Sequence, residues 1–453
     1  MRKKLLSVAC MSLLGLNGLA HGLTLKESIA SAEQIDPIVQ GVLANKDASQ
    51  AGIQIAKSKL LPLVQGVGSY GRTNQTSNQV DSNLGIYSQK YVNSTPSSQV
   101  YLKQAIFHAA DWVGLSASEL QYEFSLLKLA GAYGDLWLRV SNAWFDLIAA
   151  QETLDIQMEA ERSMTQVALQ AQKSYEAGVG TKDSALEAKA QLAFVHSNAV
   201  EAKLNLAARE KSYIALTGID QVTLSKSHLN FTKKYKLLAG SAKTFTDKVN
   251  ISAPDILSAK LAEDIRRMQL KQARLSSYPT VDLYGSYQQT QNNNINQIGL
   301  GVISSQAAVQ VTIPFYSGGL YAGQERQAAA YLESASADIK AAELRLLTAV
   351  QTYWATQEAQ VDRAVAVQEM VGAGQEVVKA YRMSVVAGLK SWSDVANSEV
   401  VLTKRRVDEV NAISALLKAQ AQLLSYLPVT DESWYAWMNA LTFEVKNVSK
   451  ATN

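Results

Sequence analysis

Two long stretches of this sequence contain no proline, and they limit its possible folds more than any other feature. They cover residues 97–253 and 315–427, and all seven prolines lie outside them. Because a proline in a helix interior costs about 3 kcal/mol, these stretches permit long uninterrupted helices. The first predicts a helix over 109–177, about 100 Å long, then a glycine-containing turn and a second helix over 181–217. Helices of this length suit a coiled coil or a tube.

Apolar residues in these helices recur every three or four positions, as in a coiled-coil seam. In the long helix the predicted seam is Tyr133, Leu136, Val140, Ala143, Leu147, Ala150, Leu154 and Met158. In the next helix it is Leu186, Ala190, Ala193, Val200, Leu204, Ala207 and Ile214. Small residues among them would let neighbouring helices approach closely. An ordinary soluble coiled coil fits this pattern equally well.

The two halves of the chain repeat each other. Tyr70 recurs 217 residues later as Tyr287, while Trp144 and Gly178 recur 210 residues later as Trp354 and Gly388. Each half therefore predicts a short helix, strand, loop, strand, long helix, turn and medium helix. The short helices are expected at 38–61 and 256–277, packed end to end with the medium helix along the long one. The Asn/Ser/Gln-rich residues 73–98 predict a longer loop in the first half.

The predicted strands alternate polar and apolar residues with period two. In the last strand Val309, Val311, Ile313 and Phe315 face one side, and Gln310 and Thr312 face the other. Four strands per chain cannot close a barrel, because open edges leave backbone groups unpaired in lipid and single-chain barrels begin at eight strands. Several copies would therefore have to share one barrel. A four-stranded sheet that caps a soluble coiled coil is the alternative.

The N-terminus has the pattern of a secretory signal peptide. Three basic residues precede a short apolar run over 5–19, and cleavage is expected after Gly22, or alternatively after Ala20. The single cysteine, Cys10, would be lost with this segment. The chain has 43 basic and 40 acidic residues, so removing the three basic residues of the leader balances the charge, and nothing favours nucleic-acid binding. No later apolar run reaches the length of a transmembrane helix, so membrane entry would require strands.

Over roughly residues 25–428 the sequence resembles the TolC-type outer-membrane factor family. The resemblance rests on the tandem repeat, on Gln104-Ala105-Ile106-Phe107, on the 313–319 segment Ile-Pro-Phe-Tyr-Ser-Gly-Gly, and on the paired turns at Gly178 and Gly388. It implies a mainly α protein with a membrane β-barrel. Long antiparallel coiled-coil helices form a periplasmic α-barrel, and each protomer of a homotrimer gives four strands to a 12-stranded barrel.

The function that the resemblance implies is a passive export duct in the outer membrane, extending into the periplasm. Such a channel-tunnel serves a tripartite efflux pump or a type I secretion system and carries drugs or proteins. A periplasmic adaptor and an inner-membrane pump open its closed tip. The implied divisions are a signal peptide (1–22), a first repeat (23–219), a second repeat (253–428), and segments 220–252 and 429–453 outside the repeat, forming a belt around the tube.

The resemblance also assigns functional residues near the two turns. At the pore aperture, Asp394 would form an acidic ring, with Asn397 in place of a second aspartate and Lys390 as a basic closing residue. Asp183 and Ser184 would belong to the same region. Val385 replaces a tyrosine of the closing network. Helix N-capping is the alternative role for Asp394 and Asp183.

The turns themselves would dock the adaptor. The residues expected at the docking tips are Gly178, Val179, Gly180, Gly388 and Leu389. The glycines could equally serve only the turn conformation.

The sequence shows no catalytic constellation, no cofactor motif and no metal-ligand spacing, so we expect neither an enzyme nor a bound cofactor. The alternative function is a periplasmic coiled-coil adaptor or scaffold without a barrel. An adaptor would be expected to carry a small β-rich lipoyl-like domain between its helical arms, and the sequence predicts none.

Overall fold

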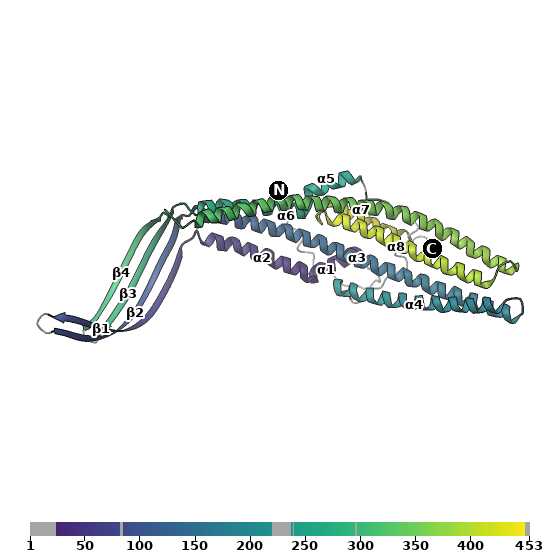
Figure 1. Ribbon diagram of the computed structural model, residues 1–453, viewed down its shortest axis with the longest axis horizontal. Coiled ribbons are helices and arrows are strands. Elements are labelled where there is room, and N and C mark those ends of the chain that lie inside the picture. The colour runs from purple at the N-terminus through teal and green to yellow at the C-terminus, as the bar shows by residue number, and fades with distance from the viewer. Residues whose placement is uncertain (1–23, 82–84, 220–236, 239, 295–296, 449–453) are drawn as a thin grey trace.

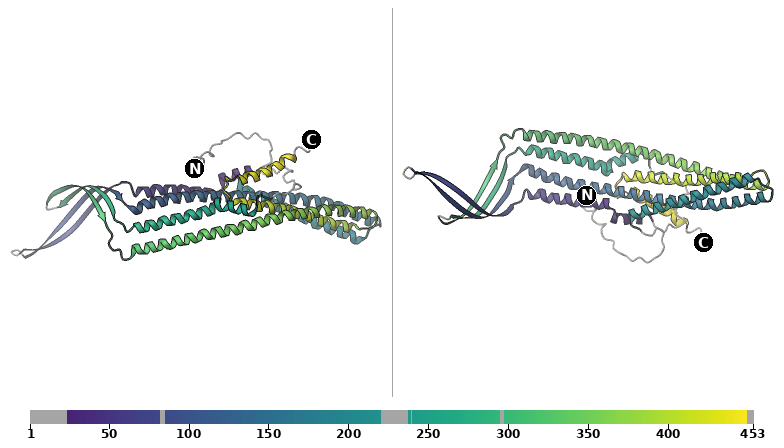
Figure 2. Two further views of the ribbon diagram at one scale, coloured as in Figure 1. Left: turned by 90° about the horizontal axis from the view of Figure 1, so that it is seen from above. Right: turned by 60° about the horizontal axis from the view of Figure 1, so that its bottom comes forward.

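The computed structural model describes residues 24–81, 85–219, 237–238, 240–294 and 297–448. The molecule is elongated, with all four of the strands in these residues at one end and the helical hairpins at the other (Figures 1 and 2). The predicted signal peptide and most of residues 220–241 lie outside the described part of the chain.

Two long helices form the frame of the molecule, and shorter helices lie along them. The frame is α3 (Ala109–Glu176, 68 residues) and α7 (Leu320–Val386, 67 residues). The shorter partners are α2 (Pro37–Ser58), α4 (Lys182–Thr217), α6 (Pro254–Leu275) and α8 (Trp392–Ser425). Helices α2 and α4 lie end to end along α3, as the repeat predicted, and α6 and α8 do the same along α7 (Figure 1). Contacts of α3 with α6 and α8 join the halves.

The strands form one antiparallel sheet in the order β1-β2-β3-β4. Their bounds are β1 Leu63–Asp81, β2 Gly85–Phe107, β3 Thr280–Asn294 and β4 Gln297–Thr312. The last strand ends before Ile313 and Phe315, so the prediction that these two residues extend it is wrong. Pro314 explains the early end, because it has no N–H for strand pairing. Among the described strands, β1 and β4 each keep one unpaired edge.

Residues 73–81 and 85–98 of the predicted loop are instead strand. The β1–β2 pairing continues without a register shift from Leu63 opposite Lys103 to Asp81 opposite Gly85. The polar composition of this stretch wrongly indicated a loop, because strand preference depends strongly on context. Pairing between β1 and β2 satisfies the backbone hydrogen bonds whatever the side chains are. The first hairpin therefore projects beyond the second (Figure 1).

One face of the sheet is mainly apolar and the other mainly polar, as the alternation predicted. Residues opposite each other in the register share a face, so Val281 and Val311 lie on one face and Asp282 and Gln310 on the other. The apolar face carries Val64, Tyr70, Val100, Leu102, Val281, Leu283, Tyr287, Ile303, Val309 and Val311. The polar face carries Gln65, Ser69, Gln99, Tyr101, Lys103, Asp282, Tyr284, Ser286, Gln306 and Gln310.

Three further helices were not predicted from the sequence: α1 (Leu25–Ile35), α5 (Ala242–Ser252) and α9 (Glu432–Val448). Both ends of α5 lie 217 residues after those of α1, so α5 follows the repeat although its segment was expected to fall outside it. Aspartate Asp36 caps α2, and its position is taken by Ala253 before α6. Within the described residues, no helix combines the length and apolar character needed to cross a membrane.

The largest core lies at the middle of the molecule. Tryptophans Trp144 and Trp354 are buried there, which confirms that they pack between helices. Helix α9 joins this core through Trp434 and Trp437, whose rings meet α3 edge-on at Trp137 and Phe145. A smaller core near the turns joins α3, α4 and α8 through Ala160, Met164, Val167, Ala171, Ala185, Ala188, Val195, Val395 and Ala396.

The predicted seam is buried in the middle of α3 but is not the face that α4 buries within its own chain. Leu136, Val140 and Leu147 are buried, but Met158 is 45% exposed because the buried stripe continues through Ile156 and Ala160 instead. In α4 the predicted Leu186, Ala190, Val200 and Leu204 are exposed, Leu204 by 68%. The residues that α4 buries within the chain are Ala185, Ala188, Val195, Ala199, Ala202, Leu206, Tyr213 and Thr217. The α4 stripe is apolar but faces away from its own chain.

Candidate functional site

The candidate site is the end of the molecule farthest from the sheet, where the two hairpins turn (Figure 1). Both turns have the same backbone. Gly178 has φ 73° and Gly388 has φ 75°, a region that residues with a Cβ rarely adopt. In the first turn the N–H of Gly178 donates to Tyr175 O at 3.0 Å and that of Val179 to Ser174 O at 3.0 Å. This is the Schellman pattern that ends many helices.

The second turn repeats these bonds. The N–H of Gly388 donates to Val385 O at 3.0 Å, and the N–H of Leu389 donates to Ser384 O at 2.9 Å. Both glycines are therefore required by the backbone, whatever else they do. Gly180 has a separate reason to be glycine, because a Cβ there would lie 3.1 Å from the Ser174 side chain.

An aliphatic side chain follows each positive-φ glycine and points into solvent. Val179 is 82% exposed and Leu389 is 78% exposed. Val386 and Met383 add further exposed apolar surface beside the second turn. Exposed apolar groups at the extreme end of a long hairpin are unusual in a chain that works alone, and groups of them mark interaction surfaces.

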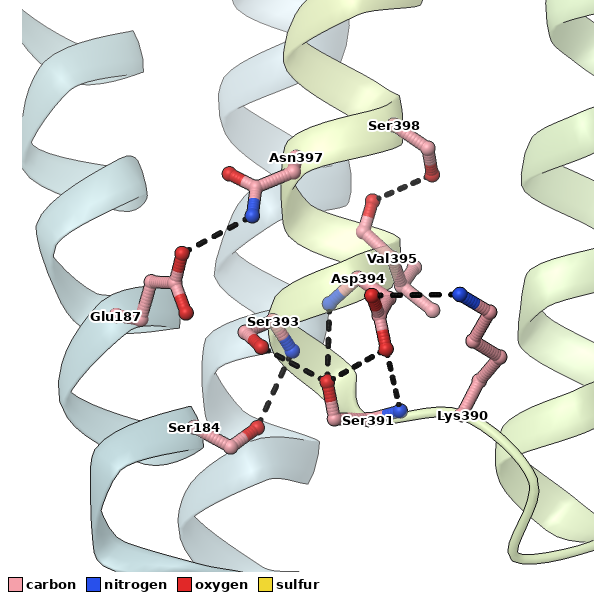
Figure 3. A network of polar contacts seen from close by, with 9 residues as sticks. All are labelled: Ser184, Glu187, Lys390, Ser391, Ser393, Asp394, Val395, Asn397 and Ser398. Carbon is pink, nitrogen blue, oxygen red and sulfur yellow. Dashed lines mark hydrogen bonds and ion pairs between the residues drawn. The ribbon is translucent and has the colours of Figure 1, made fainter.

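Each helix after a turn begins with a hydroxyl cap, but only the second has a full capping box. Thr181 Oγ1 accepts from the Ser184 N–H at 3.2 Å. Ser391 Oγ accepts from the Asp394 N–H at 3.2 Å, and Asp394 Oδ2 in return accepts from the Ser391 N–H at 2.9 Å and from its hydroxyl at 2.8 Å (Figure 3). Asp394 is thus a helix-capping residue, as its alternative role required.

Lys390 lies between Asp394 and an aromatic ring. Its ammonium is 3.6 Å from Asp394 Oδ1 and 4.6 Å from the centre of the Tyr381 ring. Hydrogen bonds from the Ser391 backbone and hydroxyl, helped by the Lys390 charge, hold the pKa of the Asp394 carboxyl below its ordinary value of 3.8. Asp394 therefore carries its negative charge throughout the neutral range.

Direct bonds join the second turn to the first hairpin. The Ser393 N–H donates to Ser184 Oγ at 3.2 Å (Figure 3), and the indole N–H of Trp392 donates to Ser174 Oγ at 3.0 Å. Ser184 therefore lies in the polar network between the hairpins, with a backbone N–H rather than a charged group as its partner. The bond from Trp392 was not foreseen.

Asn397 links α8 to α4 rather than standing free. Its amide donates to Glu187 Oε1 at 3.0 Å (Figure 3), and its carbonyl oxygen accepts from the Gln191 amide at 3.0 Å. The sequence analysis missed Glu187 and Gln191. Because α4 places them one turn apart, on the face toward α8, their spacing of four residues was the available signal.

Asp183 is exposed in the first turn of α4 and makes no ion pair or cap bond with any residue that the structure describes. Val385, where the resemblance would have a tyrosine, packs in the small apolar core near the turns. Tyr381, one helical turn earlier on α7, supplies the aromatic contact to Lys390 instead.

A second polar link between the hairpins lies farther from the turns. The Arg382 guanidinium forms an ion pair with Glu399, and it also donates to Ser163 Oγ at 2.8 Å. Ser163 Oγ donates to Glu399 at 3.1 Å, so α3, α7 and α8 meet at one largely buried carboxylate. No group of three or more potential metal ligands occurs among the described residues.

The comparisons with known proteins agree on one kind of protein. The sequence model of the family described as outer membrane efflux protein matches residues 29–218 and 246–427. The outer membrane protein TolC of Vibrio cholerae is 23% identical over 402 residues, covering 87% of this chain and 89% of that protein. The alkaline protease secretion protein AprF of Pseudomonas aeruginosa is 22% identical over 416 residues, with coverages of 91% and 86%.

Solved structures show the same fold. The Campylobacter jejuni CmeC outer membrane channel has a TM-score of 0.76 at 15% identity, covering 93% of this chain and 89% of that one. The open state of the Neisseria gonorrhoeae MtrE outer membrane channel has a TM-score of 0.71 at 16% identity, with coverages of 89% and 88%.

Proposed function

This chain belongs to the outer membrane efflux protein family, and we propose that three copies of it form one export duct that opens at the helical tip. Membership places the protein among outer-membrane channels of efflux and type I secretion systems, which extend into the periplasm. Channels of this family work with an adaptor and an inner-membrane pump. An adaptor or scaffold function for the chain itself is not favoured.

The observation that carries the trimer is the combination of two open edges with two unlike faces in one sheet. Strands β1 and β4 each have an unpaired edge within the described chain, and an open edge is prohibitive in lipid. Pairing β4 of one copy with β1 of the next removes every edge, and three copies give twelve strands. The apolar face would then meet lipid and the polar face would line the duct.

The helices support the same arrangement. Helices α2 and α4 lie along one side of the helical layer and α7 along the other (Figure 1). Both sides carry exposed apolar residues, namely Leu186, Phe194, Val200 and Leu204 on α4 and Leu344, Val365, Met370 and Val377 on α7. Contact between these stripes in neighbouring copies would bury them and continue the barrel as a helical tube.

At the tip, three copies of Asp394 would surround the axis as an acidic ring. Lys390 would partly offset the negative charge of this ring. Asn397, which is hydrogen-bonded to Glu187 and Gln191, would take the place of a second acidic ring. Repulsion between the copies would oppose the effect of Ser391 on the Asp394 pKa. Opening would require the hairpins to part, and thus the bonds from Ser393 and Trp392 to break.

The exposed Val179 and Leu389 suit the adaptor's helical hairpins. We expect Val179→Asp/Leu389→Asp to abolish cross-linking to the adaptor while leaving the trimer intact, because both side chains are solvated within the chain. Normal cross-linking would place docking elsewhere. We also propose that residues 1–22 are removed on export, and that α5 and α9 belong to a belt around the middle of the tube.

The test of the duct is outer-membrane fractionation followed by gel electrophoresis without heating. The wild-type chain should migrate as a stable trimer. Val311→Arg places a charge on the apolar face, where a cation costs about 2–4 kcal/mol at mid-bilayer and less toward either interface, and should reduce trimer yield. The neighbouring Gln310→Arg faces the other side and serves as the matched control. Equal yields of the two variants would contradict the membrane sheet.

A further inference from the structure

The apolar face of the sheet carries two cationic side chains, Arg72 on β1 and Lys90 on β2. Their face follows from the unbroken β1–β2 register, in which Arg72 lies opposite Ser94 and Lys90 opposite Thr76. Side chains on the polar face are marked by contacts such as Ser69 to Ser97, 2.7 Å apart. Arg72 and Lys90 are each an odd number of residues from these positions, so they point to the opposite face, with Tyr70 and Val100.

These two cations have no acidic partner among the described residues. Among strand residues whose side chains the structure describes, four are charged: Arg72, Lys90, Lys103 and Asp282. Lys103 and Asp282 pair with each other at 3.6 Å on the polar face, and His108 lies 3.1 Å from the same carboxylate. Arg72 and Lys90 are exposed and form no ion pair with a described residue. Among the described side chains, Lys103 and Asp282 of the polar face are thus paired, whereas Arg72 and Lys90 of the apolar face are not.

The two cations lie on the part of the apolar face beyond Tyr70, away from the helices. Arg72 is the next residue on its face after Tyr70, about 7 Å farther along the strand, and Lys90 lies about 13 Å beyond Arg72. Tyrosines at the end of an apolar band mark the membrane interface in barrels. Tyr287, the repeat counterpart of Tyr70, is followed on its face by the neutral Gln289. Among the described side chains, cations on this face therefore occur only in the first hairpin, where Arg72 directly follows the tyrosine of β1.

We propose that Arg72 and Lys90 bind phosphate groups of lipid headgroups at the outer surface of the outer membrane. The inference rests on the proposed function, which puts the strands in the membrane and their distal turns outside. The guanidinium of Arg72 can form two parallel hydrogen bonds to one phosphate, and the Lys90 ammonium acts as a mobile point charge. Three copies would give six such cations around the rim, fixing the longer hairpins to the lipid surface.

The test compares lipid binding by trimers purified in a neutral glycoside detergent. The probe is diphosphorylated lipid A in mixed micelles, with phosphatidylcholine as the lipid of no net charge, and the readout is lipid phosphorus retained per trimer. Each cation near an anionic surface is worth about fivefold in affinity. Arg72→Gln/Lys90→Gln should therefore bind lipid A roughly 25-fold more weakly, and each single variant about fivefold more weakly. Phosphatidylcholine retention should not change.

Two gain-of-charge variants provide the matched control. Gln289→Arg creates a cation at the repeat counterpart of Arg72 and should strengthen lipid A binding. Gln288→Arg, one residue away and on the polar face, should not. Equal lipid A binding by the wild type and the double glutamine variant would overturn the proposal, and so would equal strengthening by both arginine variants. Absence of a wild-type trimer on unheated gels, before any lipid is added, would overturn the duct and this inference together.

Discussion

The turn between α3 and α4 and the turn between α7 and α8 differ in their side chains although their backbones match. Each has a positive-φ glycine, the same pair of Schellman bonds and an exposed aliphatic residue next to the glycine. The first turn is tighter, because the Gly180 N–H also donates to Ser174 O at 2.9 Å. The second has Lys390 at the counterpart of Gly180 and Asp394 at the counterpart of Ser184.

The two turns share the backbone conformation that a sharp helical turn requires, and they differ in side chains that the turn does not require. The backbone of a sharp helical turn permits few solutions, so both halves use glycine in the same conformation. The Lys390–Asp394 ion pair and the Trp392 indole, which donates to Ser174 of the other hairpin, occur only in the second turn. We therefore propose that both turns supply shape and docking, and that closure and ion selection belong mainly to the second turn.

Removing the indole of Trp392 should have the largest effect on the closed tip. Trp392 packs in the small core near the turns and donates to Ser174, so Trp392→Ala should destabilise the local structure by about 2–3 kcal/mol. We expect subtilisin to cleave the tip of the trimer more than tenfold faster, since about 1.4 kcal/mol is tenfold in the open population. Its counterpart Lys182 is exposed, and Lys182→Ala should leave the cleavage rate nearly unchanged. Similar rates for the two variants would contradict the asymmetry of the turns.

Alanine at the two glycines should have smaller and equal effects. A Cβ at Gly178 or Gly388 would meet no atom within 4 Å, so only the positive φ is strained, at about 1–2 kcal/mol. Gly178→Ala and Gly388→Ala should therefore raise the subtilisin cleavage rate by the same factor. A clearly larger effect at one glycine would show that the two backbones are not equivalent.

The capping carboxylate predicts a small acid effect confined to the second turn. The folded pKa of Asp394 is lowered, so its stabilisation is complete above its ordinary value of 3.8 and is lost as the pH falls below it through the folded pKa. Because subtilisin is inactive at such low pH, opening of the tip would be measured by amide hydrogen exchange of α8 instead. The exchange rates would be compared between pH 5 and pH 2.5 after correction for the intrinsic exchange rate at each pH. Protection should fall on acidification in the wild type and should change less in Asp394→Asn. An identical pH profile in the wild type and in Asp394→Asn would show that the Asp394 carboxylate does not stabilise the second turn.

The sequence predicted most of the architecture because proline placement and repeat spacing constrain long helices directly. The apolar seam of α3 was predicted correctly as far as Leu147. This part of α3 packs against helices on both sides, so its apolar residues are buried within the chain. The seam of α4 was not predictable, because Leu204 and its neighbours form an apolar stripe that is exposed in the single chain, and periodicity cannot tell which partner covers it. The strands beyond Thr73 were missed because pairing, not composition, makes them strands.

The sequence predicted where the candidate site lies, but not which side chains contact one another within it. Glycine and aspartate after a long helical stretch locate the turns, and Asp394, Lys390 and Ser184 do lie in one polar cluster. The contacts of Trp392 with Ser174 and of Asn397 with Glu187 cross between hairpins about 200 residues apart in sequence. Contacts of this kind depend on how α4 and α8 pack, which residue spacing within either helix does not specify.

The most direct test of the central claim is the reversal potential of single channels in a planar bilayer under a salt gradient. The account predicts a moderately cation-selective wild-type trimer, because the Asp394 ring is partly offset by Lys390. Asp394→Asn should shift the reversal potential toward zero, while Asp183→Asn, in the first turn, should shift it much less. An unchanged reversal potential in Asp394→Asn, or an equal shift in both variants, would contradict the assignment of ion selection to the second turn.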